Sequence, residues 1–385
     1  MADSQKCDTV KLATALLVSV SQTVKTLEKE TSAMREKCST VSFKGQVIYC
    51  GIDVHKKSWQ IAIRHCRHQL ESYSMNPDAV ELAKHLKLNY PEGEYRSVYE
   101  AGFSGFEAHR TLCGLGVKNI VINPADVPTS GKEREYKNDT LDCRKLAREL
   151  ENGSLTGIYI PPPENLELRN LTRRETQLTG NITRVKNRIH GHLDFMGLKF
   201  ISWSGRSLKI MESDAEKRYD YVLLSDLREL RFLREEKLRV IRDERECLKR
   251  LKREKIQENL QSIPGIGFRT AIVLQAELWD LSRFRDKDAL NSYVGLAPRT
   301  VGSGEDERIK FGGNRKKKQL HYILIEAAWR AIRFSLEHRA RYGRLIAKGA
   351  CPQRAITIIA KKLLLSIRAV WLQDRKFVEL LPKTK

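Results

Sequence analysis

The sequence lacks the cysteine clusters that bind zinc or build a disulfide framework. Its eight cysteines are scattered through 385 residues, with no CxxC pair and no Cys/His spacing suited to zinc. It also lacks any run of the roughly 18 apolar residues that a membrane span requires, and neither end carries a lipidation motif. The short apolar stretch 12–20 follows Asp3 and Asp8, the wrong charge for a secretory leader. These absences predict a soluble cytoplasmic protein with reduced thiols.

Acidic residues are in deficit. The chain has 48 Asp and Glu against 70 Lys and Arg, so its formal net charge is +22. Such an excess of cations is typical of proteins that bind a polyanion, and nucleic acid is the partner we expect. A basic protein of membrane surfaces would instead show a basic amphipathic helix or a lipidation motif, and no such motif stands at either end. The length predicts two or three domains.

Residues 46–160 have the pattern of an α/β domain with a mixed sheet. Strands are expected over 47–54, 59–64, 69–74, 95–99 and 119–123, and helices over 78–88, 105–115 and 140–151. Residues 1–45 precede this domain and carry apolar residues at helical spacing. We expect one amphipathic helix there, packed on its own domain or used to bind a partner.

Prolines 161–163 mark a break, after which leucines recur every seven residues. The expected seam of the first helix is Leu168, Leu171, Leu178, Ile182, Val185, Ile189 and Met196. A second helix over 219–259, with Leu227, Leu230, Leu238, Ile241, Leu248 and Leu251 on one side, should fold back on it. The pattern predicts an antiparallel coiled-coil arm over 161–260, with 197–217 at its tip, and a helical domain over 261–385.

Acidic residues follow the ends of two expected strands. Asp53 ends the first strand and Glu100 ends the fourth, while Asp139 and Asp142 stand three apart at the start of a helix. Strand ends in an open α/β sheet gather ligands, and carboxylate oxygens suit Mg²⁺. Asp139 and Asp142 could instead be a helix cap and a first-turn acid. The nearby His55 is interpreted as a phosphate contact or a solvated side chain rather than a base.

Two further segments could bind nucleic acid. In the motif IPGIG, Gly265 and Gly267 separate two helices and could turn backbone N–H groups toward a phosphate, as in a helix-hairpin-helix, or form a plain structural turn. The first arm helix carries a row of cations: Arg169, Arg173, Arg174, Arg184, Lys186 and Arg188. We expect this row to contact a nucleic-acid backbone.

The segment 295–318 places Ser303 between Gly302 and Gly304, where a hydroxyl can approach a substrate closely. Cations surround it in sequence: Arg299, Arg308, Lys310, Arg315, Lys316, Lys317 and Lys318. They could stabilise the developing charge of a phosphodiester under attack by the serine. The residues alone favour a basic loop that clamps phosphate without chemistry at Ser303. The triplet 305–307 is acidic where cations are expected.

These motifs occur together and in order. GIDVHK around Asp53, YEAGFSGF, NDTLDCRKLA, IPGIGFRTA, GLAPRTVGSG and GGNRKKKQL resemble the insertion-sequence transposases of the DEDD type, also described as bridge-RNA-guided recombinases. The resemblance covers about 47–340. It implies a fold like ribonuclease H and the RuvC-like Holliday-junction resolvases, then a coiled-coil linker and a C-terminal transposase domain with a helix-hairpin-helix.

The resemblance also implies a chemistry. Asp53, Glu100, Asp139 and Asp142 would bind Mg²⁺, and Ser303 would displace a 3′-hydroxyl from a DNA phosphodiester to form a phosphoserine link. The tetrad and serine would meet between protomers, so a homo-oligomer is expected. A structured guide RNA would pair with target and donor DNA, with the arm as part of its grip. The expected location is the nucleoid of a bacterium or archaeon.

Two other functions remain open on sequence grounds. One is a Mg²⁺-dependent Holliday-junction-type nuclease, in which the tetrad activates water and Ser303 only binds phosphate. The other is a non-catalytic nucleic-acid-binding assembly protein, in which the basic arm matters and the acids do not.

Overall fold

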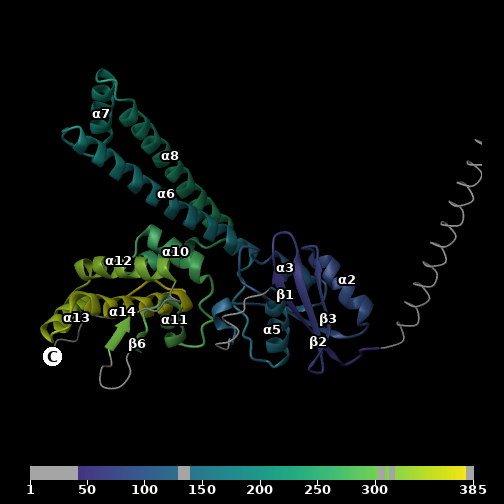
Figure 1. Cartoon of the computed structure of the whole chain (residues 1–385). Helices are drawn as coiled ribbons and strands as arrows, with labels where there is room; N and C mark the ends of the chain where they lie inside the picture. The colour runs from purple at the N-terminus through teal and green to yellow at the C-terminus, as the bar shows by residue number, and fades with distance from the viewer. Residues whose placement is uncertain (1–41, 129–138, 302–307, 312–316, 379–385) are drawn as a thin grey trace, which may run out of the picture. The chain divides into compact units, whose positions relative to one another are not determined.

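The computed structural model describes residues 42–128, 139–301, 308–311 and 317–378. Contacts divide the chain into two compact units, which meet in sequence between Ile160 and Pro161. The first unit is the α/β part and the second is helical apart from one short hairpin (Figure 1). The helix expected within residues 1–41 lies outside the described residues.

The first unit is built on a five-stranded mixed sheet of order β3-β2-β1-β4-β5. Its strands are β1 (Val47–Val54), β2 (Trp59–His65), β3 (His68–Met75), β4 (Glu94–Glu100) and β5 (Lys118–Ile122). The first three form an antiparallel meander, whereas β4 and β5 run parallel to β1. The mixed sheet is as predicted, and this order is consistent with an RNase H-like fold.

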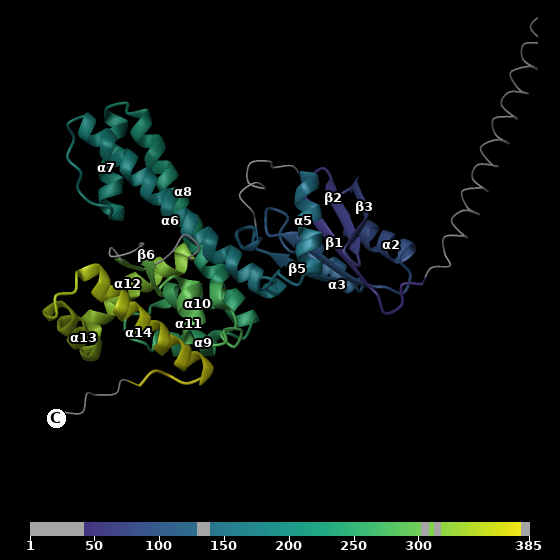
Figure 2. The same cartoon turned by 60° about the horizontal axis from the view of Figure 1, so that its bottom comes forward.

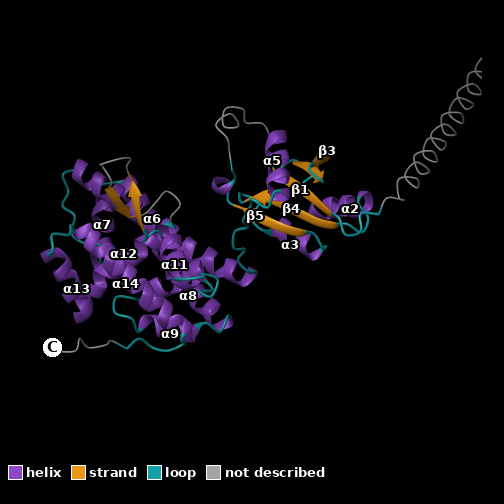
Figure 3. Ribbon diagram, turned by 90° about the horizontal axis from the view of Figure 1, so that it is seen from below, coloured by secondary structure: helices purple, strands orange, loops and turns teal. Residues whose placement is uncertain are grey.

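Helices cover both faces of this sheet (Figure 3). They are α2 (Ala79–Asn89), α3 (Glu107–Gly114) and α5 (Asp139–Glu151), and a 3-10 turn, η1 (Pro124–Asp126), follows β5. Ile48 and Ile52 of β1 pack in one core with Leu82 and Leu112 from α2 and α3. Strand residues of the opposite parity face α5, because successive side chains of a strand alternate between faces.

The second unit begins with the arm, in which α6 (Pro163–Phe195) and α8 (Tyr221–Arg250) lie side by side and α7 (Gly205–Lys217) caps the tip (Figure 2). Arg188 pairs with Asp226 near the tip and Lys237 pairs with Glu175 lower down. The higher number on one helix thus meets the lower number on the other, so the helices are antiparallel, as expected.

Several details of the predicted arm are wrong. Met196 is 49% exposed and Leu238 is 61% exposed, so neither lies in the seam. Thr172 and Glu175 are buried in it instead. The second helix ends at Arg250 rather than near 259, because Lys252 adopts a left-handed backbone with φ 54°.

The remaining helices pack around a core that also takes in Leu168 from the base of the arm. They are α9 (Glu254–Gln261), α10 (Phe268–Leu278), α11 (Lys287–Val294), α12 (Lys318–Phe334), α13 (Leu336–Ala347) and α14 (Pro352–Leu372). The glycine-rich segment contains two short antiparallel strands, β6 (Pro298–Val301) and β7 (Arg308–Phe311), which we did not predict. No helix within the described ranges is long and apolar enough to cross a membrane.

Candidate active site

Two of the predicted acids stand at the same level on neighbouring parallel strands. Ile52 of β1 is paired with Tyr99 of β4, and the next residue on each strand is Asp53 and Glu100. Each acid lies two residues beyond a position that faces α5, namely Gly51 and Val98. Side chains two residues apart in a strand lie on the same face of the sheet. Asp53 and Glu100 therefore lie on the face that α5 covers.

Helix α5 lies directly on the backbone of β1. A Cβ atom on Gly51 would be 2.1 Å from the carbonyl oxygen of Cys143 and 2.5 Å from the amide nitrogen of Ala147. Ala62 of β2 packs in the same small-residue cluster with Cys143 and Ala147. Only glycine at position 51 therefore allows this approach, two residues before Asp53.

Helix α5 is oriented so that its first turn lies toward the C-terminal end of β1. At its C-terminus, Glu151 accepts a hydrogen bond of 2.9 Å from Arg64, whose strand partner is Tyr49 near the start of β1. The helix therefore runs antiparallel to β1, and its first turn, with Asp139 and Asp142, lies toward the end that carries Asp53. Segments about 90 residues apart in sequence thus converge on one edge of the sheet.

Electrostatic contacts support this arrangement. The Asp53 carboxylate lies 3.0 Å from Nε2 of His55, so the histidine contacts the acid rather than only solvent. Burial, followed by the charge of Asp53, raises the pKa of the Cys143 thiol to about 11. Asp53 is on β1 and Cys143 is on α5, so this charge effect places the Asp53 carboxylate close to α5.

The donor chemistry of this edge fits a divalent cation. Carboxylate oxygens are the ligands that Mg²⁺ prefers, and the edge supplies them from β1, β4 and α5. Among the side chains that the structure describes, no three His, Cys, Asp or Glu residues lie close enough together to hold a metal ion. The side chain of Asp139 lies outside the described side chains. The ends of β1 and β4 and the first turn of α5 therefore lie at one edge of the sheet. The four carboxylates as metal ligands remain a prediction.

In the second unit, the IPGIG turn joins α9 to α10 and lies against α12. Gly265 has φ +88°, and a Cβ there would be 2.5 Å from the carbonyl oxygen of Ala327. Arg330 of α12 donates to the Gly265 carbonyl at 3.1 Å and to the Thr270 hydroxyl at 3.0 Å. Gly267 directly precedes α10 and has open space where a Cβ would lie. The turn is structural on one side and open on the other.

That open side belongs to a cavity of about 1030 Å³. Its lining includes the turn itself, Thr176 and Thr179 of α6, and Lys318, Tyr322 and Arg330 of α12. An aromatic ring and two cations beside the N-terminus of α10 make a surface that suits a phosphate backbone.

Comparison with known proteins identifies the family. A transposase family model, DEDD_Tnp_IS110, matches residues 50–197, and a model described as "Transposase IS116/IS110/IS902 family" matches residues 257–343. The chain belongs to the IS110 family of transposases. A transposase acts on DNA, so the enzyme and the DNA partner predicted from the sequence are confirmed. The DEDD domain implies a divalent metal in general.

Curated relatives carry the same description. Putative transposase y4qE of Sinorhizobium fredii is 25% identical over 298 residues, covering 73% of this chain and 71% of that protein. Putative transposase y4rJ of the same organism is 27% identical over 314 residues, covering 70% and 75%. The transposase for insertion sequence element IS1111A of Coxiella burnetii is 28% identical over 233 residues, covering 58% and 62%.

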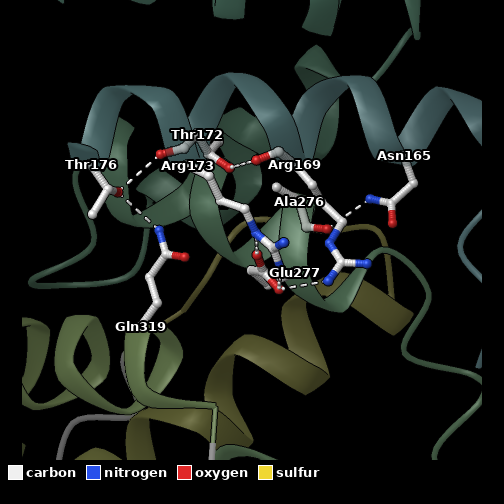
Figure 4. Close-up of polar contacts among 8 residues, drawn as sticks. All are labelled: Asn165, Arg169, Thr172, Arg173, Thr176, Ala276, Glu277 and Gln319. Atoms are coloured by element: carbon white, nitrogen blue, oxygen red, sulfur yellow. Dashed lines mark hydrogen bonds and ion pairs between the residues drawn. The ribbon is translucent and has the colours of Figure 1, made fainter. Parts of the chain in front are cut away.

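The base of the transposase arm is fastened to α10 and α12 (Figure 4). Arg169 and Arg173 of α6 both pair with Glu277, at 3.3 and 2.9 Å, and the Glu277 side chain is only 3% exposed. Asn165 donates to the Ala276 carbonyl at 2.7 Å. Two of the cations that the sequence offered for nucleic acid therefore hold the protein together.

The other arm cations differ in their contacts. Arg188 pairs with Asp226 at 2.8 Å and with Glu229. Lys186 lies over the ring of Trp203 at 4.9 Å, and burial lowers the pKa of its ammonium group. Arg174 and Arg184 are exposed, and Arg184 donates to Asn181. Arg188 is 51% exposed as well, but its charge is paired with acids, so Arg174 and Arg184 are the arm cations best able to contact a nucleic-acid backbone.

Part of the predicted site lies beyond the described residues. Ser303, Arg315 and Lys316 fall outside them, and so do the side chains of Arg299, Arg308 and Lys310 in β6 and β7. Lys317 precedes α12, and its ammonium lies 5.6 Å from the centre of the Tyr293 ring. The serine loop of the transposase therefore remains a prediction.

Sequence reasoning missed two features of this transposase. It gave Gly51 no role, although a glycine inside an apolar strand is a signal of close backbone approach. It also missed a cavity at the end of β1 that Phe103 helps to line. Phe103 stands in the motif YEAGFSGF, but nothing in that pattern distinguishes an exposed phenylalanine from a core one.

Proposed function

We propose that this transposase cleaves and rejoins DNA at the ends of an insertion element and at its target, using Ser303 as nucleophile and a metal site of Asp53, Glu100, Asp139 and Asp142. The observation that carries the proposal is the edge of the sheet where β1 and β4 end at one level and α5 points its acidic turn toward them. Four carboxylates converging there would repel one another unless they share a cation.

In this proposal the chain's own groups divide the work. The Ser303 oxygen forms a bond to phosphorus, the bond from phosphorus to the 3′-oxygen breaks, and the proton lost by the serine balances the one gained by the 3′-hydroxyl. Bound Mg²⁺ would lower the cost of the charge that develops on the phosphate oxygens. Asp53, steadied by His55 at 3.0 Å, is the carboxylate whose position the strand sets.

The helical unit would grip the nucleic acids. In the proposal, the turn at Gly265 and Gly267 acts as a helix-hairpin-helix that takes DNA phosphates on its open side, beside the cations of α12. A structured guide RNA would contact the exposed arm cations Arg174 and Arg184, and a homo-oligomer would bring serine and tetrad together. Base pairing by that RNA would supply sequence specificity, while the protein reads backbone and shape.

A covalent-adduct assay tests the chemistry. Labelled DNA carrying the element end is incubated with Mg²⁺, the purified transposase and the structured RNA encoded beside its gene, and denaturing gels resolve protein-linked DNA. We expect Ser303→Ala to yield no adduct and Asp53→Asn to lower the adduct rate about a thousandfold, since the metal supplies several kcal/mol. Glu81→Gln, at an exposed acid of α2, is the matched control and should react normally.

The outcomes separate the alternatives. An adduct formed by Ser303→Ala would overturn the serine mechanism. Cleavage without adduct in the unaltered protein would indicate a nuclease in which water attacks. Full activity in Asp53→Asn would overturn the metal site, and DNA binding with neither cleavage nor adduct in the unaltered protein would leave only the binding functions.

A test of RNA binding by the arm needs a variant that leaves the fold intact. Arg173→Glu is unsuitable because Arg173 pairs with the buried Glu277. Arg174→Glu with Arg184→Glu should weaken RNA binding at least tenfold at low salt and reduce its salt dependence. Lys87→Glu on α2 carries the same kind of charge change as a control, and equal weakening by that variant would contradict a role for the arm.

A further inference from the structure

A second cavity lies at the end of β1, within the sheet unit. Its volume is about 460 Å³, and its walls come from the β1–β2 connection, the start of α2 and the start of α3. Lys56, Trp59, Phe103 and Thr111 are among its lining residues. A space of this size admits one planar base with its sugar but not a base pair within a duplex.

The walls have the chemistry of a stacking site. Phe103 is 63% exposed, although its ring has no polar group to solvate, and the Lys56 ammonium lies 5.7 Å from the centre of that ring. Trp59 is 5% exposed and closes the cavity from the core side. An exposed aromatic face beside a cation is how proteins hold bases of single strands, because every base has a π face.

The cavity adjoins the candidate metal site. His55 lines it, and Nε2 of the same histidine lies 3.0 Å from the Asp53 carboxylate. Asp53 starts from the face of the sheet that α5 covers, whereas α2 and α3, which wall the cavity, cover the other face. A base next to a phosphodiester held at Asp53 would therefore enter the cavity past the end of β1, beside His55. Because His55 belongs to both sites, the base that the cavity binds should come from the DNA strand under attack rather than from distant DNA.

The rim discriminates between base and phosphate. Asp78 and Glu107 both line the cavity. The Asp78 carboxylate accepts hydrogen bonds from the Val80 and Glu81 amides, and Glu107 accepts one from Arg110. These two carboxylates offset the charge of Lys56 in the same lining, which disfavours a phosphate there, whereas the exocyclic amino groups and ring faces of a base carry no charge to repel.

We propose that this cavity binds a nucleobase that has left the duplex stack next to the scissile phosphate, with Phe103 as its platform. A paired base cannot present its face to Phe103, because its neighbours in the stack cover that face, so the base must be extruded or already unpaired. The inference rests on the proposed function, since it takes the phosphate at Asp53 as its reference point.

Fluorescence of 2-aminopurine tests the proposal independently of catalysis. The probe base is placed beside the cleavage position in duplex DNA, and the full chain is added with the guide RNA and with Ca²⁺ in place of Mg²⁺. Fluorescence should rise as the base leaves the stack, and Phe103→Ala should abolish most of that rise. Phe103→Trp keeps a flat ring and should retain DNA cleavage in Mg²⁺, whereas Phe103→Ala should slow it about tenfold.

Leu88→Ala, which removes another exposed apolar side chain of the same unit, should change neither readout. Thermal unfolding of Phe103→Ala should match that of the unaltered protein, because the ring is exposed. Equal fluorescence and equal cleavage in Phe103→Ala would overturn the base site while leaving the proposed function intact. Failure of the unaltered protein to cleave would instead count against the proposed function, and the fluorescence rise would still decide the base site.

Discussion

The two units position their candidate functional segments by different physical means. In the sheet unit, α5 is seated on β1 through small residues, with Gly51 against the backbone of Cys143 and Ala147. In the helical unit, a glycine contact at Gly265 is joined by buried charges. Glu277 there pairs with two arginines of the arm.

A second buried acid strengthens this contrast. Glu175 of α6 pairs with Lys237 at 3.0 Å, and its other oxygen lies 2.8 Å from Arg269 of α10, an ion pair that is close but not aligned as a hydrogen bond. Burial, followed by the charge of Glu175, raises the pKa of nearby Glu244 to about 7. A contact made by small side chains depends on volume alone, whereas this cluster depends on protonation. The helical unit should therefore respond to pH near 7, where the packing at Gly51 does not.

The largest effect is expected at Gly265. Gly265→Ala places a Cβ 2.5 Å from the carbonyl oxygen of Ala327 and forces a side chain into a left-handed backbone, with φ +88°. The two costs should lower the free energy of unfolding by about 4 kcal/mol. Chemical denaturation of the full chain measures this loss. Gly267→Ala, two residues on and in open space, should be nearly neutral, and a similar loss there would show that the turn tolerates no side chain anywhere.

Gly51→Ala should be the next most severe change. Its φ is ordinary, so the cost comes only from overlap with the α5 backbone, which we expect to be about 3 kcal/mol. Because α5 must shift, adduct formation should also fall, and to a greater extent than the loss of folded protein explains. Gly114→Ala at the end of α3 has open space and serves as the control. An unchanged adduct rate in Gly51→Ala would mean that the seating of α5 is not needed for chemistry.

Glu244→Gln tests the predicted difference in pH response. The folded-state pKa of Glu244 is raised from 4.5 to about 7, so its stabilising contribution is complete below pH 4.5 and is lost as pH rises through 7. Glutamine mimics the protonated form and should raise the free energy of unfolding at pH 8 on the order of 2 kcal/mol, with little change at pH 4.5. Thermal melts across this range measure it. Glu246→Gln on the same helix, at an exposed acid, should show no such trend.

The smallest effect is expected at a glycine that touches nothing. Gly180 lies inside α6 with open space where a Cβ would be. Gly180→Ala should stabilise the protein by about 0.5 to 1 kcal/mol, because alanine loses less backbone entropy in a helix. Denaturation midpoints would detect this gain. A loss would indicate that the exposed side of α6 is covered by another molecule or chain.

Local periodicity accounts for how much of the fold could be predicted. The alternation of apolar residues placed β1, β2 and β3 within one or two residues of their observed bounds, and the helical spacing placed α2, α5 and α6 similarly. Where local patterns conflict with tertiary packing, the prediction was wrong. Leu238 fits the leucine spacing yet is exposed, because Val240 takes the buried position on α8.

The sequence by itself determined which residues could carry chemistry, namely acids at strand ends and a serine between glycines. It also determined the excess of Lys and Arg over Asp and Glu. Only the tertiary structure decided that Asp53 and Glu100 stand at one level, that α5 runs antiparallel to β1, and that Arg173 is bound to Glu277. Strand register and helix direction arise from contacts between distant segments, and no local pattern encodes them. The packing at Gly51 is such a contact, since its partners lie more than 90 residues away.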